Sequence, residues 1–177
     1  MPELTKTSKF ISLVLRHNPK AANLSLDFRG WANVDALLEG ARAQGLPISK
    51  TFLDQVVAEN NKSRFEYSPD KLKIRARQGH SIKVDLGYEP VAPPKLLYHS
   101  SATRFIKSIQ ESGLLKGDRH AVHLSADSGT DTGKRHGIPV LLTVRAEELA
   151  ETGALFYHTD NDVWLTDNVP VRYLDGI

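Results

Sequence analysis

A proline-rich stretch near the middle of the chain is the feature that most constrains its fold. Residues 84–95, VDLGYEPVAPPK, hold three prolines and one glycine between two longer segments with apolar patterns of their own. Because proline has no backbone N–H to give to a helix or a sheet interior, such a stretch is typical of a linker. A chain of 177 residues is long enough for two small domains. We therefore expect a first domain over 1–83, a linker over 84–95 and a second domain over 96–177.

The first half predicts three helices followed by a β-hairpin. Residues 10–15 place apolar side chains three and four apart, and Pro19 ends this helix at about His17. The residues suited to cap the three helices are Thr5, Thr7 or Ser8 for the first, Asn33 for the second and Ser49 for the third. Two strand-like segments follow, at 64–68 and 71–77. This order is that of a winged-helix domain, although a fold alone does not assign a function.

The second half predicts short strands separated by short helices. Its strand-like segments are 96–101, 121–126, 139–146 and 171–174, together with a hairpin that turns at Asp160 and Asn161. A helix over 102–113 carries the apolar residues of one face. With the helical first half, this pattern predicts an α+β protein whose second lobe is mostly β.

Composition narrows the function only slightly. Lys and Arg total 23 against 21 acidic residues, so an anion site must come from local clusters and not from the net charge of +2. Without cysteine there is no disulfide, no thiolate nucleophile and no cysteine-bound zinc. No apolar run approaches the length of a membrane span, and the N-terminus lacks a signal-peptide core. We expect a soluble, intracellular protein located in the cytoplasm.

The first helix ends in Arg16 and His17, which admit two interpretations. Cations are favoured at a helix C-terminus, so the pair could serve only as a cap. Alternatively, a guanidinium and an imidazole on one rigid helix could bind a phosphate. The choice between these interpretations depends on the rest of the chain.

Three further polar clusters could carry chemistry. Their members are Asn61, Lys62 and Arg64 before the hairpin; Arg75, Gln78, His80 and Ser81 after it; and His99, Ser101, Arg119, His123, Ser125 and Arg135 in the second half. Arginine offers paired donors that match phosphate oxygens, and histidine adds acid–base capacity near neutral pH. Each cluster also has a simpler interpretation, since basic hairpins are often only solvated and strand histidines often only fill a core.

Several classes of site are not indicated. The seven histidines show no HExxH pattern, and carboxylates are absent from the clusters, so no metal is expected. There is no GxSxG motif of a serine hydrolase. There is also no Walker or GxGxxG loop, so a nucleotide would need another mode of binding.

Taken together, these stretches resemble the NAD-dependent RNA 2′-phosphotransferases, which remove an internal 2′-phosphate from RNA. The resemblance rests on SKFISLVLRHNP at 8–19, IRARQGHS at 74–81, RHAVHLSAD at 119–127 and GKRHGIPVLL at 133–142, with shorter matches elsewhere. The matches run in the family's order and cover nearly the whole chain. The segments 74–81 and 119–127 are the most specific.

The resemblance implies a winged-helix RNA-binding lobe and an ADP-ribosyltransferase-like lobe that holds NAD⁺. The catalytic residues it implies are Arg16, His17, Arg64 and Arg135, with Arg119 as the competitor of Arg135. The NAD⁺ contacts it implies are His99, Ser101, Arg119, His123 and Ser125, and the RNA phosphate contacts are Lys62, Arg75, Gln78, His80 and Ser81. One departure is Ser100, where the family has glycine. Val163 stands near the position of the glutamate of protein-modifying ADP-ribosyltransferases, which argues against that activity.

The implied reaction transfers the 2′-phosphate to NAD⁺ through an ADP-ribosylated 2′-phosphate, as in tRNA splicing. Its products are 2′-OH RNA, ADP-ribose 1″,2″-cyclic phosphate and nicotinamide, with no metal, membrane or protein partner required. Two alternatives stay open. One is an ADP-ribosyltransferase that acts on the terminal phosphates of nucleic acids. The other is a non-enzymatic winged-helix RNA-binding module that senses NAD⁺.

Overall fold

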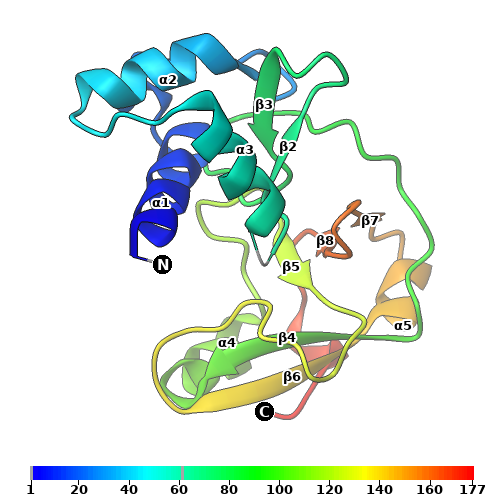
Figure 1. Ribbon diagram of the computed structural model, residues 1–177. Coiled ribbons are helices and arrows are strands. Elements are labelled where there is room, and N and C mark those ends of the chain that lie inside the picture. Colours follow the sequence, from blue (N-terminus) through cyan, green and yellow to red (C-terminus); the bar gives the residue numbers. More distant parts are fainter. Residues whose placement is uncertain (1, 61) are drawn as a thin grey trace. The chain divides into compact units, whose positions relative to one another are not determined.

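Two units, Met1–Gly87 and Tyr88–Ile177, make up the chain in the computed structural model, which describes residues 2–60 and 62–177 (Figure 1). The division falls inside the stretch predicted as a linker. Residues of that stretch are bonded to the unit on their own side: the Asp85 N–H donates to the Phe28 carbonyl at 2.9 Å, and the Val91 N–H donates to the Phe156 carbonyl at 2.8 Å. The stretch therefore contributes ordered backbone to each unit.

The first unit consists of helices and one small sheet. Its elements are α1 (Pro2–Arg16), η1 (Pro19–Ala22), β1 (Ala32–Asn33), α2 (Val34–Ala43), α3 (Lys50–Glu59), β2 (Phe65–Tyr67) and β3 (Lys73–Ala76). The predicted hairpin is confirmed, since β2 and β3 pair antiparallel. The sheet has the order β1-β3-β2. The short strand β1, which pairs with the far side of β3, was not predicted from the sequence.

Two of the three predicted helix caps are confirmed. The Asn33 side chain accepts a hydrogen bond from the Ala36 N–H at 2.9 Å, and the Ser49 side chain accepts one from the Phe52 N–H at 3.1 Å. The cap predicted for the first helix is wrong. The helix α1 begins at Pro2, so the candidate caps lie inside it, and Thr7 is buried there.

The core of the first unit is formed by the inner faces of the three helices and the sheet. Its fully buried side chains include Ile11, Val14 and Leu15 of α1. Each such side chain contributes about 1.5–3 kcal/mol when it leaves water. Burial of three residues in the last turns of α1 therefore holds the C-terminal end of this helix, which carries Arg16, in a fixed place.

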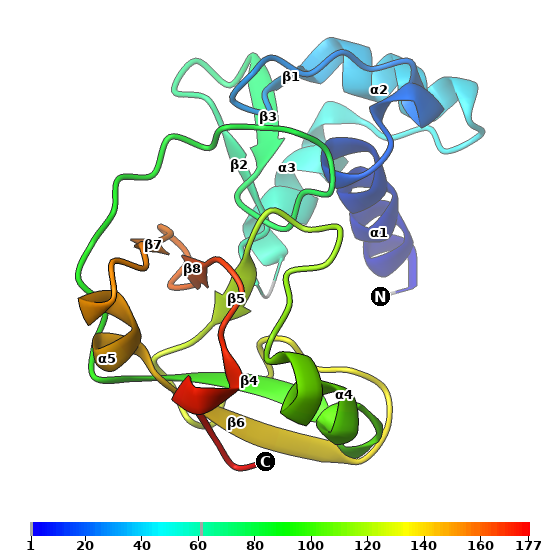
Figure 2. The ribbon, with the colours of Figure 1, turned by 180° about the vertical axis from the view of Figure 1, so that it is seen from behind.

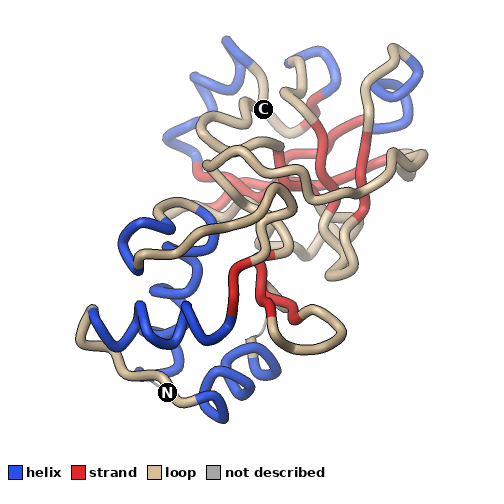
Figure 3. The backbone as a smooth tube through the Cα atoms, turned by 90° about the horizontal axis from the view of Figure 1, so that it is seen from above, coloured by secondary structure: helices blue, strands red, loops and turns tan. Residues whose placement is uncertain are grey.

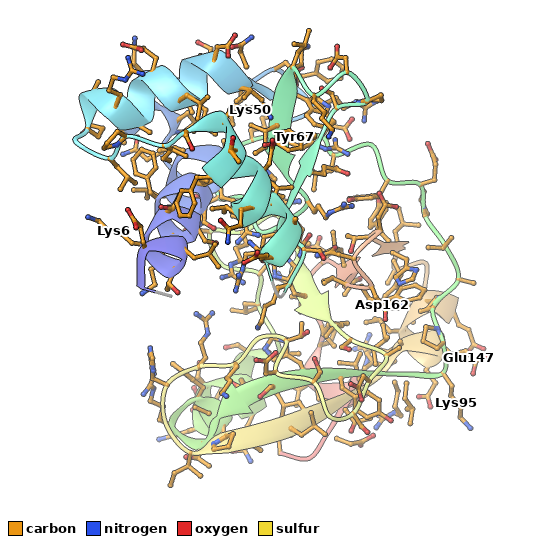
Figure 4. All side chains as sticks on the ribbon, viewed as in Figure 1. Lys6, Lys50, Tyr67, Lys95, Glu147 and Asp162 are labelled. Carbon is orange, nitrogen blue, oxygen red and sulfur yellow. The ribbon has the colours of Figure 1, made fainter. Side chains whose placement is uncertain are left out.

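A polar contact also ties α3 to the sheet. Lys50 on α3 lies beside Tyr67 on β2, with its Nζ atom 4.3 Å from the ring centre (Figure 4). The Tyr67 hydroxyl donates to Asp54 at 2.8 Å. The hydrogen bond from Lys50, followed by that from Tyr67, lowers the pKa of Asp54. Burial, followed by the bond to Asp54, raises the pKa of Tyr67. These groups are engaged in holding the fold.

The second unit contains two antiparallel sheets. Its elements are β4 (Leu96–Ala102), η2 (Thr103–Phe105), α4 (Ile106–Ser112), β5 (Val122–Leu124), β6 (Pro139–Arg145), α5 (Ala146–Glu151), β7 (Phe156–His158), β8 (Trp164–Thr166), η3 (Val171–Tyr173) and β9 (Leu174–Asp175). The sheets have the orders β4-β6-β9 and β5-β8-β7. The long strands β4 and β6 lie side by side, with α4 against them (Figure 2). The predicted hairpin at 160–161 is confirmed as the turn between β7 and β8.

A bridge between Tyr98 and Ser125 joins the two sheets of this unit. The Tyr98 N–H on β4 donates to the Ser125 carbonyl at 2.8 Å, and the Ser125 N–H donates back to the Tyr98 carbonyl at 2.9 Å. Ser125 lies directly after β5, so the bridge brings the middle of β4 against the end of β5. His99 on β4 and His123 on β5 are consequently neighbours.

The predicted fold class, α+β, is confirmed. Helices dominate the first unit, and strands are concentrated in the second (Figure 3). Across residues 2–60 and 62–177, no helix is both long and apolar enough to cross a membrane.

Candidate functional site

The first candidate site lies at the C-terminal end of α1. Arg16 is the last residue of the helix, and the N–H groups of His17 and Asn18 both donate to the Leu13 carbonyl, at 2.9 and 2.8 Å. These bonds close the final turn and fix the backbone of both cationic residues. The partial negative charge of the helix end favours the guanidinium and a protonated imidazole here.

A segment after β3 wraps around this helix end. The Ser81 N–H donates to the Arg16 carbonyl at 2.9 Å, and the Ser81 Oγ atom lies 2.8 Å from Nδ1 of His17. Gly79 has a φ of +88°, and a Cβ atom there would lie 3.4 Å from Cζ of Arg16. The backbone at residue 79 therefore lies against the guanidinium, and its left-handed conformation favours glycine. Sequence reasoning had not singled out Gly79.

Gln78 and His80 flank this glycine and are both buried, with exposed fractions of 8% and 0%. A Cβ atom added to Gly30 would lie 3.4 Å from Nε2 of His80. His80 thus fills space beneath the loop that contains Gly30. Its predicted contact with an RNA phosphate, and that of Gln78, stay predictions.

Arg64 is held by Asn60, the residue that follows α3. The Asn60 Oδ1 atom accepts a hydrogen bond from Nη1 of Arg64 and one from the backbone N–H of Lys62, both at 3.2 Å. The Asn60 Nδ2 atom donates to Oγ of Ser8 on α1 at 3.3 Å. The largely buried side-chain amide of Asn60 therefore fixes Arg64 beside α1. The sequence did not identify Asn60 as a site residue, because its position there indicates only the end of a helix. Asn61 lies outside the described residues.

Arg75 is engaged within the fold. Its Nε atom donates to Oε1 of Glu66 at 2.7 Å, and its Nη1 atom donates to the carbonyls of Arg29 and Leu86, both at 3.3 Å. Its guanidinium lies 4.5 Å from the centre of the Trp31 ring. These contacts account for most of its donors. Arg75 therefore holds the sheet, a loop and residue 86 together, and its predicted contact with RNA stays a prediction.

The second candidate site is centred on His99 in the second unit. The Nδ1 atom of His99 lies 2.9 Å from the His123 carbonyl oxygen, to which it donates. The Ser100 N–H donates to the Thr132 carbonyl at 2.8 Å. A Cβ atom on Gly133 would overlap the imidazole ring of His99, at 2.2 Å from its Cε1 atom. Only glycine therefore lets this segment pass over the ring. Sequence reasoning had not identified Thr132 or Gly133.

Two arginines give the region around His99 a positive potential. Nη1 of Arg119 lies 3.2 Å from Nδ1 of His123. Burial lowers the pKa of His99, the bond to the His123 carbonyl opposes this shift, and the charges of Arg135 and Arg119 lower the pKa further. Burial, followed by the charge of Arg135, also lowers the pKa of Arg119. Because the positive charges in this cluster repel one another, the cluster favours an anionic ligand.

The serines of this site are mostly covered. Ser101 is 4% exposed and Ser125 is 8% exposed, and the Ser125 Oγ atom accepts a hydrogen bond from the Asp127 N–H at 3.0 Å. Ser100, the departure from the family's glycine, is buried as well. No group of three His, Asp or Glu side chains suited to a metal ion occurs among the described residues.

Each site, considered within its own unit, presents arginine and histidine side chains on a rigid scaffold. Such sets of donors are suited to phosphate groups. Comparison with known sequences specifies the class: the model of the RNA 2′-phosphotransferase, Tpt1/KptA family matches residues 2–168. The chain belongs to this family.

Curated relatives support the assignment over almost the full length. A protein of Agrobacterium fabrum described as a probable RNA 2′-phosphotransferase is 53% identical over 172 residues, which are 96% of this chain and 92% of that protein. A protein of Escherichia coli with the same description is 48% identical over 98% of this chain and 96% of its own length. One of Pseudomonas aeruginosa is 49% identical over 97% of this chain and 96% of its own length. The similarity therefore includes both units.

Proposed function

We propose that this RNA 2′-phosphotransferase is NAD⁺-dependent and removes an internal 2′-phosphate from RNA. NAD⁺ serves as co-substrate and accepts the phosphate, and the products are 2′-OH RNA, ADP-ribose 1″,2″-cyclic phosphate and nicotinamide. The observation that carries the proposal is the His99 cluster, where an oriented imidazole lies in the field of Arg119 and Arg135. Membership of the family supplies the RNA 2′-phosphate as substrate.

We further propose that the first unit is a winged-helix lobe and the second an ADP-ribosyltransferase-like lobe. The element order α1-β1-α2-α3-β2-β3 and the sheet order β1-β3-β2 support the former. Support for the latter comes from the two antiparallel sheets that meet at the Tyr98–Ser125 bridge, beside a histidine on the first long strand. The fold of each lobe positions its site, but the chemistry depends on the side chains.

The chemistry of the donors in the second unit fits a dinucleotide. NAD⁺ carries a pyrophosphate, and Arg119 and Arg135 supply two positive charges that would offset it. The bond from Nδ1 of His99 to the His123 carbonyl fixes the tautomer and orientation of His99, which leaves its Nε2 edge for a ligand. Ser101, His123 and Ser125 would complete the contacts from the same two strands.

The first unit would bind the RNA phosphate. The 2′-phosphate is already a nucleophile, so it needs positioning and charge compensation more than a general base. Arg16 and Arg64 suit this role because α1 and Asn60 hold them in place. His17 would hold or deliver a proton as charge develops on the transferring phosphoryl group. Lys62 would add a further positive charge.

Of the two candidates for the last catalytic arginine, Arg119 has the better-supported position. Its guanidinium contacts Nδ1 of His123 at 3.2 Å, beside His99. The two arginines nevertheless influence each other electrostatically. We therefore assign direct contact with the reacting groups to Arg119 and charge compensation to Arg135.

The test uses the purified full chain, a short RNA with one internal 2′-phosphate, and NAD⁺. The proposal expects loss of the 2′-phosphate only when NAD⁺ is present, with stoichiometric release of nicotinamide and the cyclic phosphate, detected by mass spectrometry. Accumulation of an RNA that keeps a stable ADP-ribosylated terminal phosphate would favour the end-modifying alternative. Binding of RNA and NAD⁺ without any product would favour the non-enzymatic alternative.

A further inference from the structure

We propose that Ser81 is a positioning residue that fixes the imidazole of His17 in its reactive orientation. The inference rests on the proposed function, since it takes His17 as the proton-handling group of the transfer. It assigns Ser81 a role different from the RNA phosphate contact predicted from the sequence. The contacts around the C-terminal end of α1 support this role.

The backbone of Ser81 is anchored independently of its side chain. Its N–H donates to the Arg16 carbonyl at 2.9 Å, and the preceding residue, His80, is fully buried. The serine is therefore held beside the residue that precedes His17. The backbone groups that hold it remain when the side chain of residue 81 is substituted. This anchoring makes its hydroxyl a fixed reference point for the imidazole.

The imidazole of His17 needs such a reference. His17 follows the last helical residue and is exposed, so polar contacts contribute to the choice among its side-chain rotamers. The 2.8 Å contact between its Nδ1 and the Ser81 Oγ atom selects one of them. The same contact distinguishes the two ring nitrogens, because Nδ1 faces the serine and Nε2 lies at the opposite edge of the ring.

The N–H and the hydroxyl of Ser81 both point toward the helix end. The N–H is directed to Arg16 and the hydroxyl to His17. The hydroxyl of Ser81 is therefore already engaged with the imidazole. This geometry is that of a residue, Ser81, which influences the reaction by orienting His17.

The test compares the full-length variants Ser81→Ala, Ser81→Thr, His17→Ala and the double variant in the RNA dephosphorylation assay. Loss of the general acid–base group in His17→Ala should reduce kcat about 100-fold or more. Loss of one orienting hydrogen bond in Ser81→Ala should reduce kcat about tenfold, without change in the KM for NAD⁺. Ser81→Thr keeps a hydroxyl and should restore most of the activity. Ser112→Ala, which removes an exposed hydroxyl at the end of α4, is the matched control and should be unaffected.

The double variant decides between a positioning and a direct role. If Ser81 acts through His17, Ser81→Ala has no further effect once His17 is alanine. An additional tenfold loss in the double variant, or failure of Ser81→Thr to recover activity, would overturn the proposal. Thermal unfolding of each variant shows whether a loss reflects folding.

A spectroscopic readout makes the inference independent of turnover. The ring nitrogens of His17 should shift in the NMR spectrum of Ser81→Ala relative to wild type and Ser81→Thr, with or without substrates. If the wild-type protein proved inactive on 2′-phosphorylated RNA, the proposed function would fail while this shift would still support the contact. Unchanged ring resonances in Ser81→Ala would reject the positioning role even in an active enzyme.

Discussion

Gly133→Ala should damage the His99 site through a single added methyl group. The φ of Gly133 is +86°, and the new Cβ atom would lie 2.2 Å from Cε1 and 2.6 Å from Nδ1 of His99. Nonbonded carbon atoms do not approach each other so closely, so either the imidazole of His99 or the backbone at residue 133 must move. Movement of the ring breaks its bond to the His123 carbonyl, because the Nδ1 atom that makes this bond is one of the atoms in conflict.

The expected loss of folding free energy in Gly133→Ala has two parts. An L side chain in the left-handed region costs about 1–2 kcal/mol wherever it is placed. The lost bond from His99 adds about 0.5–1.5 kcal/mol, and more if the His123 carbonyl stays buried without another donor. If the displaced ring also forfeits one hydrogen bond to NAD⁺, the affinity for NAD⁺ falls about tenfold, since 1.4 kcal/mol corresponds to a factor of ten.

Gly153→Ala is the matched control for this variant. Gly153 also has a positive φ, +98°, and a Cβ atom there would meet nothing within 4 Å. Both variants should therefore share the backbone cost of about 1–2 kcal/mol in thermal unfolding, and Gly133→Ala should lose further stability through the broken His99 bond. Only Gly133→Ala should weaken NAD⁺ binding, as measured by calorimetry or by the KM for NAD⁺. Equal NAD⁺ affinity in the two variants would refute the assignment of His99 and its covering segment to the nucleotide site.

Three further predictions concern the basic residues and His99. Arg64→Ala should abolish most activity with little change in stability, whereas Arg75→Ala should lower the free energy of unfolding by roughly 2–4 kcal/mol, because it breaks a largely buried ion pair with Glu66. Equal losses of activity at equal stability would mean that the basic clusters are wrongly assigned. Because burial, Arg135 and Arg119 lower the pKa of His99, the unfolded chain binds this proton more readily than the folded chain. Stability should therefore decline as the pH falls below about 6.5, the ordinary histidine pKa. Arg135→Gln should raise the pKa of His99 in an NMR titration, and an unchanged value would contradict the electrostatic coupling.

Features that depend on neighbouring residues were predictable from the sequence. Asn33 and Ser49 were identified as caps because a cap bonds to N–H groups only three residues ahead. The β2–β3 hairpin followed from two short strand-like segments that are close together. The start of α1 was missed, because the polar residues Thr5, Thr7 and Ser8 have the chemistry of caps and yet lie within the helix.

Features that depend on distant residues were not predictable. The sequence displayed Arg64 and Arg75 as similar basic residues, and only the cross-strand pairing of Glu66 with Arg75 shows that Arg75 is already engaged. Likewise, nothing near Gly133 in the sequence indicates that it covers His99, which lies more than thirty residues earlier in the chain. Candidate site residues were thus recognisable by type, but the groups that hold them required the structure.

The fate of the phosphorus atom tests the central claim most directly. An RNA with a radiolabelled internal 2′-phosphate is incubated with the full chain, with and without NAD⁺, and the products are separated by chromatography. The proposed function predicts that the label leaves the RNA only with NAD⁺ and appears in ADP-ribose 1″,2″-cyclic phosphate. Release of the label as inorganic phosphate, or its release without NAD⁺, would contradict the account.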